Sequence, residues 1–301
     1  MSAVAEAASG ARKTMLGVRL REAGWGYGFV LMPMAVFGLF FIYPIGYAVY
    51  ISFHNWGILG NQGSAGWSNY GQVIHDPIFH TALKNIAEYT VGVVPLEMAL
   101  GLSLALIVNA KIRGRNFFRS AFYFPSLASS VAITTIMLYL FAYNGPFNNL
   151  FGFHTDWFGN ASTDTWAIVG LNAWTTSGTI MLFYLAALQS IPTDVYEAAA
   201  VDNTGGWRTF WKITFPLLRP AHFFVLVVFG IGALKLFDQS YIVSGGTGGP
   251  NYSLYTPILY IYRTAFASSE IGLAAAAGII YFLIIFVLTA AERLTVGRPQ
   301  R

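Results

Sequence analysis

Long apolar runs alternate with polar segments along this chain, and they predict the elements of the fold. A helix that crosses the hydrocarbon core of a bilayer needs about 20 consecutive, mostly apolar residues. Six runs of that length occur, at residues 27–53, 86–108, 120–143, 166–188, 221–243 and 271–291. The sequence therefore predicts an all-α, polytopic membrane protein with six transmembrane helices, in which residues 1–301 form a single transmembrane domain.

The Lys and Arg residues are distributed very unevenly between the two sides of these runs. Fourteen of them lie before the first run, in the segments 109–119 and 189–220, or after the last run, whereas only Lys84 and Arg263 lie in the alternate segments. Cytoplasmic loops carry the excess of Lys and Arg. We therefore expect both termini and these two segments to be cytoplasmic, and 54–85, 144–165 and 244–270 to be interfacial loops on the outer side.

The composition agrees with a surface that faces lipid. Only 10% of the residues are charged, whereas a typical soluble domain has about a quarter. The chain has no cysteine, which excludes disulfide scaffolds and thiolate chemistry, and its five histidines lack the spacing of metal ligands. Its basic residues form no stripe with interleaved aromatic residues. We expect neither a metal site nor a nucleic-acid partner.

The sequence lacks the residues that nucleotide hydrolysis and intramembrane catalysis would need. The chain contains no Gly-Lys dipeptide, so it cannot form the P-loop that cradles nucleotide phosphates. An intramembrane enzyme would need a polar cluster, such as a histidine with carboxylates, inside the spans, and the runs contain none. We therefore expect a non-catalytic protein with no cofactor of its own.

The segment 189–220 is too long and too patterned for a simple connection. Pro192 and Asp194 suit the first turn of a helix. Residues 203–206 tolerate the left-handed conformation that ends a helix. A second short helix from Trp207 is predicted to end before Phe215, because the residue that precedes a proline is disfavoured in a helix. We expect this helix–turn–helix to be a binding surface for a partner protein. The alternative interpretation is an amphipathic helix that rests on the membrane surface.

The same segment resembles the cytoplasmic signature of the permease subunits of bacterial ABC importers, which reads Glu-Ala-Ala, three residues, Gly, nine residues, Ile, one residue, Leu-Pro. Glu197-Ala198-Ala199, Ile213 and Pro216 match at this spacing, whereas Asn203 and Phe215 replace Gly and Leu. Residues 109–119, 248–250 and 260–266 also resemble the carbohydrate-type maltose and glycerol-3-phosphate permease group. The resemblance identifies the following as ATPase-coupling residues: Glu197, Ala198, Ala199, Asp202, Asn203, Gly205, Ile213 and Pro216.

The resemblance also implies a fold, partners and a location. It implies the type I ABC importer permease fold in a bacterial inner membrane, surrounded by lipid. The implied partners are a second, similar but non-identical permease, two ATPase subunits that hold ATP and magnesium, an extracytoplasmic solute-binding protein and a small-molecule solute. The segment 189–220 would dock on the ATPase subunits.

Polar side chains within the spans are the candidates for contact with a solute, because they are costly in lipid unless they face a cavity. In the resembled family the solute lies among the third, fourth and fifth spans. The substrate-binding candidates are Ser126, Ser130, Trp174, Thr175, Thr176, Thr179, Lys235, Asp238 and Gln239. The hydroxyls alternatively bond the backbone of their own or a neighbouring helix.

Three charged residues within the spans have specific interpretations. Lys235 and Asp238 are three residues apart, which predicts that they share one helix face and can pair; the pair alternatively faces the partner subunit. Glu97 closely follows Pro95, and we interpret it as a group that repairs the helix there; the alternative is a role in gating.

The solute itself stays open between several classes. Hydroxyls and Trp174 favour a sugar, whereas Lys235 would suit glycerol-3-phosphate or a glycerophosphodiester. A function of a different class is an ion-gradient-driven secondary transporter that uses Asp238 and Lys235. The principal hypothesis is the permease subunit of an ATP-driven sugar importer, which forms half of the translocation pathway.

Overall fold

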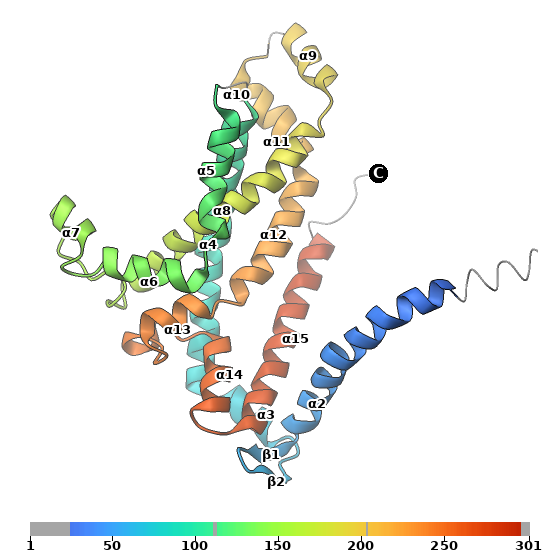
Figure 1. Ribbon diagram of the computed structural model, residues 1–301, viewed down its shortest axis with the longest axis vertical. Coiled ribbons are helices and arrows are strands. Elements are labelled where there is room, and N and C mark those ends of the chain that lie inside the picture. Colours follow the sequence, from blue (N-terminus) through green and yellow to red (C-terminus); the bar gives the residue numbers. More distant parts are fainter. Residues whose placement is uncertain (1–24, 111–112, 203, 296–301) are drawn as a thin grey trace, which may run out of the picture.

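The computed structural model describes residues 25–110, 113–202 and 204–295, and their regular structure is almost entirely helical (Figure 1). Five helices are long and apolar enough to cross a membrane, and a bent pair makes a sixth. They are Trp25–Ser52, which contains η1 (Gly38–Ile42) and α2 (Tyr43–Ser52); α4 (Pro77–Asn109); the bent pair α5 (Arg115–Leu127) and α6 (Ser130–Leu140); α8 (Asp164–Gln189); α12 (Arg219–Leu234) with α13 (Asp238–Ser244); and α15 (Ile271–Thr295). The predicted spans recur in order, and the third and fifth are broken.

Shorter elements lie at the two ends of these helices (Figure 1). At one end are β1 (His54–Gly57), β2 (Gly60–Ser64), α3 (Ser68–His75) and α14 (Pro257–Phe266). α7 (Pro146–Phe151) lies beyond α6 at the side of the bundle, and η3 (Pro250–Tyr252) precedes α14 in the chain. At the other end are α9 (Thr193–Val201), α10 (Gly206–Thr209), η2 (Phe210–Thr214) and α11 (Phe215–Leu217). α15 runs toward the end that carries α9, so its described end at Thr295 and the segment 189–220 lie on the same side of the bundle, as expected. Residues 1–24 and 296–301 lie outside the described part.

The centre of the bundle is the contact between α4 and α8. Leu102 and Ala105 on α4 are buried against Ile180 and Tyr184 on α8. Gly101 makes this approach possible, because a Cβ at this position would lie 2.3 Å from Cγ2 of Ile180. Small residues at helix contacts inside membranes let backbones approach closely. The two helices therefore form a core on which α5 and α12 pack.

The crossing of α5 and α8 depends on Gly178. A Cβ there would lie 2.3 Å from the carbonyl oxygen of Phe122, where no side chain can give way. We expect Gly178→Ala to destabilise the protein by about 1–3 kcal/mol, the usual cost of overpacking, and to lower its thermal unfolding midpoint in detergent. Gly170→Ala on the same helix is the control, because it has open space around it. Equal midpoints for the two variants would contradict the close crossing.

The third predicted span, 120–143, is not one helix. α5 and α6 meet at 93°, and Ala128 and Ser129 between them are extended, with φ −80° and ψ 151°, and φ −59° and ψ 130°. Pro125 lies three residues before the break, and its missing N–H weakens the helix there. The bend places Ser130 at the start of α6, inside the bundle.

The fifth span is broken at residues 235–237, and other helices satisfy the carbonyl groups that the break frees. The hydroxyl of Tyr281 on α15 donates to the carbonyl of Leu234, and the hydroxyl of Thr256 donates to that of Leu236 at 3.0 Å. Non-helical backbone is tolerated at membrane depth only where it has such hydrogen-bond partners or lines a water-filled cavity. The predicted span 221–243 is therefore present within Arg219–Ser244, but its helix is interrupted at residues 235–237.

The end that carries β1 and β2 is more ordered than the loops that were expected there. β1 and β2 pair as an antiparallel hairpin, and α4 begins at Pro77, well before the predicted start at residue 86. The hydroxyl of Tyr260 on α14 donates to the carboxylate of Asp76 at 2.6 Å, which ties α14 to the start of α4. The small hairpin is the one departure from an all-α fold within the described residues.

The first helix leaves the bundle (Figure 1). Its apolar side chains are exposed along nearly the whole length from Trp25 to Tyr50, and only its last turns pack against other elements. Ile51 and Ser52 are its buried residues.

Candidate functional site

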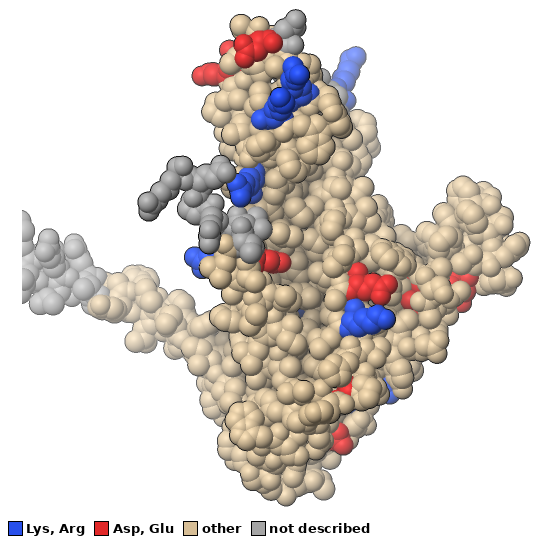
Figure 2. Space-filling model, turned by 180° about the vertical axis from the view of Figure 1, so that it is seen from behind, with Lys and Arg blue, Asp and Glu red and all other residues tan. Residues whose placement is uncertain are grey.

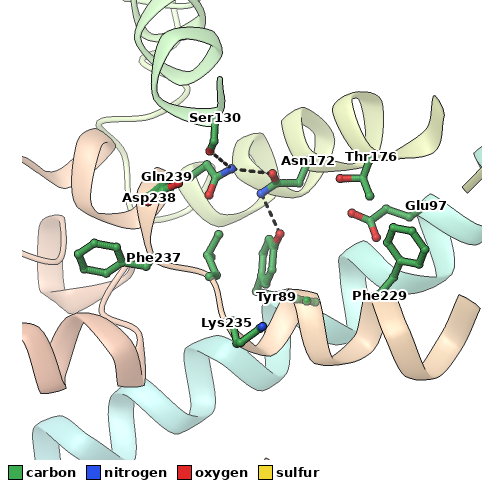
Figure 3. Close-up of a pocket in the computed structure, with 13 residues that line it drawn as sticks. Tyr89, Glu97, Ser130, Asn172, Thr176, Phe229, Lys235, Phe237, Asp238 and Gln239 are labelled. Carbon is green, nitrogen blue, oxygen red and sulfur yellow. Dashed lines mark hydrogen bonds between the residues drawn. The ribbon is translucent and has the colours of Figure 1, made fainter. Parts of the chain in front are cut away.

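A polar cavity of about 310 Å³ opens inside the bundle, between α4, α8 and the two breaks in the helices (Figure 3). The break between α12 and α13 and the start of α6 supply one part of its wall, and α4, α8 and α12 supply the rest. Its polar lining residues are Tyr89, Glu97, Ser130, Asn172, Thr176, Lys235, Asp238 and Gln239.

A chain of hydrogen bonds crosses this cavity and fixes its amide groups. Asn172 Nδ2 donates to the hydroxyl of Tyr89 at 2.8 Å. Gln239 Nε2 donates to Asn172 Oδ1 at 2.8 Å and to the hydroxyl of Ser130 at 2.9 Å. One network thus joins α4, α8, α13 and α6. Because each amide has a defined partner, its remaining donor and acceptor positions are oriented before a solute arrives.

A second cavity of about 220 Å³ adjoins the first, and the two share Ser130, Asn172, Thr176 and Gln239. It is also lined by Ser126, Thr175 and Thr179. The hydroxyl of Ser126 donates to the carbonyl of Thr175 at 2.5 Å, and that of Thr175 donates to the carbonyl of Asn172 at 3.1 Å. These two hydroxyls therefore have backbone partners, as the alternative interpretation expects, while they still face the cavity.

Trp174 lies apart from both polar cavities. It lines an apolar pocket together with Trp157 and Trp166, and 47% of its surface is exposed. The other eight predicted substrate-binding residues line one or both polar cavities: Ser126, Ser130, Thr175, Thr176, Thr179, Lys235, Asp238 and Gln239.

Lys235 and Asp238 line the cavity, but they do not share a helix. Lys235 caps the end of α12 and Asp238 begins α13. Their expected placement on one helix face is wrong, because the chain changes direction between them. Both side chains are exposed in this single chain, so they lie at the open side of the cavity.

Glu97 is the main cavity residue that is absent from the predicted substrate-binding residues. Its carboxyl lines the cavity and faces Thr176 (Figure 3), whereas we interpreted it as a repair of the helix near Pro95. The signal was present, since Glu97 is an ionisable residue inside a span. Tyr89 carries no such signal, because a tyrosine in an apolar run looks like any other large side chain.

The predicted helix–turn–helix is present at one end of the molecule. α9 contains Glu197, Ala198 and Ala199, of which the first two are exposed and Ala199 is buried. Asp202 ends α9 and Gly205 precedes α10, while Asn203 lies outside the described residues. Figure 2 shows acidic side chains gathered at this end, with Lys and Arg side chains close to them. The predicted first helix is confirmed, whereas Gly205 before α10 is extended, with φ −62° and ψ 152°, and not left-handed as expected.

The two parts of this segment are held together by side chains. The hydroxyl of Thr204 donates to the carbonyl of Ala199 at 2.7 Å and lies 3.1 Å from that of Thr209. The hydroxyls of Tyr196 on α9 and Thr214 on η2 are 3.3 Å apart. These contacts fix α9 to the helical segment that follows it.

The second helix was predicted to end before Phe215. In the structure it continues to Leu217. η2 is a π turn in which the N–H of Phe215 bonds the carbonyl of Phe210, and Pro216 lies in the first turn of α11. The wider turn accommodates a proline that could not continue a regular helix. Ile213 is half-buried, Pro216 is exposed, and α12 follows at Arg219.

Together these features define a multi-pass membrane protein with a polar cavity at mid-bundle and an exposed helical segment at one end. Residues 97–299 match the family described as "Binding-protein-dependent transport system inner membrane component". The chain belongs to this family, and it is a transport permease subunit.

Relatives of known name cover nearly the whole chain. The chain is 32% identical to the multiple sugar-binding transport system permease protein MsmF of Streptococcus mutans, over 89% of the chain and 93% of the relative. It is 33% identical to the lactose transport system permease protein LacF of Rhizobium radiobacter, over 87% and 90% respectively. It is 33% identical to the arabinooligosaccharides transport system permease protein AraP of Bacillus subtilis, over 84% and 82%.

A solved structure agrees on the fold. A chain of a bacterial alginate ABC transporter, in complex with an alginate pentasaccharide-bound periplasmic protein, superposes with a TM-score of 0.77 over 89% of this chain and 93% of that chain. The identity is 22%. The predicted ABC importer permease fold is confirmed.

Proposed function

We propose that this chain is the permease subunit of an ATP-driven sugar importer and forms half of its translocation pathway. The observation that carries the proposal is the mid-bundle cavity, in which the Tyr89, Asn172, Gln239 and Ser130 side chains form one oriented network. Oriented amides and hydroxyls suit a solute that presents many hydroxyl groups. The sugar permeases among the relatives support the same class of solute.

The charges around the cavity favour a neutral sugar over a phosphorylated solute. Lys235 is the cavity's one basic side chain among the described residues, and Asp238 and Glu97 line the same cavity. A phosphate group needs several donors or cations around it, and it would meet two acidic side chains here. Glycerol-3-phosphate and the glycerophosphodiesters are therefore the weaker proposals, and family membership favours an importer over an ion-gradient-driven transporter.

A second permease would complete the pathway. The cavity is open on the side where Lys235 and Asp238 are exposed, and the first helix presents exposed apolar side chains from Trp25 to Tyr50. Both surfaces suit a partner within the membrane. A similar but non-identical subunit would make a heterodimer with one shared pathway in the bacterial inner membrane.

The exposed α9 would dock on cytoplasmic ATPase subunits, which hold the ATP and magnesium. Val201 at the end of α9 has 86% of its surface exposed, beside the exposed Glu197 and Asp202. The Tyr196–Thr214 contact would carry a movement of α9 to η2, and the helical segment leads through α11 into α12. α12 ends at Lys235 in the cavity wall, so closure of the ATPase pair could alter the cavity directly.

A solute-binding protein on the outer side would deliver the sugar. ATP binding would then stabilise one orientation of the cavity and hydrolysis the other, because each state of the ATPase pair binds one conformation of α9 better. The chain itself takes no part in hydrolysis.

Sugar-stimulated ATP hydrolysis tests this proposal. The tagged chain is purified with its associated subunits from the membranes of its source, reconstituted in lipid and mixed with the solute-binding protein. We expect maltose, maltotriose, lactose or an arabinooligosaccharide to stimulate hydrolysis, and glycerol-3-phosphate or glycerophosphocholine to have no effect. Purification without any ATPase, or stimulation by the phosphate compounds alone, would overturn the proposal.

A further inference from the structure

The mid-bundle cavity has two separate polar ends. Ser130, Asp238 and Gln239 lie at one end, and Glu97 and Thr176 lie at the other, with the Tyr89–Asn172 hydrogen bond between them (Figure 3). The hydrogen-bonded network reaches only the first end. Thr176 at the far end is a predicted substrate-binding residue, whereas Glu97 beside it is not, so this end carries an acidic group that the predicted set does not include.

Glu97 is the charged residue of this far end. Only 4% of its surface is exposed, yet its carboxyl lines the cavity and faces the hydroxyl of Thr176. A buried carboxyl inside a membrane span is costly unless polar groups reach it. Its two oxygens can bond two hydroxyl groups at once, and a solute in the cavity would bring such groups to it.

Phe229 on α12 lies beside Glu97 in the same wall (Figure 3). Its ring packs edge-on against that of Phe183 on α8, with centroids 6.1 Å apart, so its position is supported from behind. A flat aromatic face suits the apolar C–H face of a sugar ring, while the hydroxyls at the rim of that ring point sideways. An aromatic face next to an acidic group is thus a suitable pair for one sugar ring.

We propose that Glu97 and Phe229 form a second ring-binding subsite, distinct from the end of the cavity at Ser130 and Gln239. A solute would fill both ends only if it has two or more linked rings. The chain therefore selects oligosaccharides over monosaccharides within the membrane itself. This inference rests on the proposed sugar transport and gives α4 a second residue, besides Tyr89, that contacts the solute.

Equilibrium binding to the complete complex in lipid nanodiscs tests the subsite. The probes are two matched pairs, maltose with glucose and lactose with galactose. The variants are Glu97→Leu, Glu97→Gln and Phe229→Leu, with Glu88→Leu as the control, since Glu88 is an exposed acid on the same helix.

The ratio of the two affinities separates a subsite from a structural role. We expect Glu97→Leu to weaken disaccharide binding about tenfold, the usual effect of one lost hydrogen bond to an acidic group. Phe229→Leu removes the flat aromatic face and should weaken it about threefold to tenfold. Both variants should leave monosaccharide binding within about twofold. Glu97→Gln keeps the size of the side chain and should give a smaller loss of the same kind. Glu88→Leu should change neither.

Two results would overturn the inference in different ways. If the unmodified complex binds a disaccharide but the variants keep its preference over the monosaccharide, the subsite is wrong and the sugar transport stands. If the unmodified complex binds none of the four sugars, and neither maltotriose nor an arabinooligosaccharide, the proposed function fails and the subsite fails with it.

Discussion

Replacing Glu197 by lysine is expected to abolish uptake while the protein stays in the membrane. Glu197 is exposed on α9 at one end of the molecule and contributes to the acidic side chains there. If α9 docks on the ATPase subunits, the reversed charge would face a surface complementary to a carboxylate, and like charges at an interface cost several kcal/mol. Uptake of radiolabelled sugar and stimulated ATP hydrolysis should both fall to background.

The control is Glu88→Lys, the same reversal on an exposed residue of α4. It should leave uptake and hydrolysis unchanged. Membrane extracts of both variants are compared by immunoblot, so that a loss of protein is distinguished from a loss of coupling. Normal uptake by the Glu197→Lys variant would show that α9 does not couple this chain to an ATPase.

Gln239→Leu is expected to weaken transport by about tenfold or more. Gln239 donates two hydrogen bonds, to Asn172 and to Ser130, and each hydrogen bond contributes about 0.5–1.5 kcal/mol. Leucine removes both and leaves the amide oxygen of Asn172 without this donor. The concentration of sugar that gives half-maximal uptake should rise, while ATP hydrolysis without sugar should persist, because α9 lies far from this site.

The matched control is Gln72→Leu, on the exposed α3 outside the cavity. It should transport with unchanged half-saturation. If Gln239→Leu transports as well as the original protein, the network across the cavity has no role in holding the solute.

The unbroken spans could be read from the sequence because hydropathy alone determines them. The break between α5 and α6 also has a local signal in Pro125. By contrast, residues 235–237 read Lys-Leu-Phe and contain neither glycine nor proline. The break there depends on Thr256 and Tyr281, which come from other helices and receive the freed carbonyl groups. Such partners are distant in sequence, so local patterns could not indicate this break.

Helical periodicity explains the outcome for the predicted substrate-binding residues. Asn172, Thr175, Thr176 and Thr179 recur at three- and four-residue intervals and line one face of α8, which the polar cavities use. Trp166, Gly170 and Trp174 recur every four residues on another face, which lines the apolar pocket. Adjacent residues on a helix point about 100° apart. The placement of Trp174 was therefore available from spacing, whereas that of Glu97 required the position of α4 against α8.

The spacing of the signature in 189–220 was enough to place α9, since that helix depends on local residues. The continuation of the second helix through Pro216 was not predictable in the same way. It depends on the π turn at η2, where the Tyr196–Thr214 contact joins two parts of the segment.

The most direct test of the central claim is ATP-driven accumulation of a neutral disaccharide in proteoliposomes. The complex is reconstituted with ATP and magnesium at the cytoplasmic side, the solute-binding protein at the other, and radiolabelled maltose or lactose outside. We predict that the sugar accumulates above its external concentration only with ATP, and that Glu197→Lys abolishes the accumulation. Accumulation driven by an ion gradient without ATP would contradict the account.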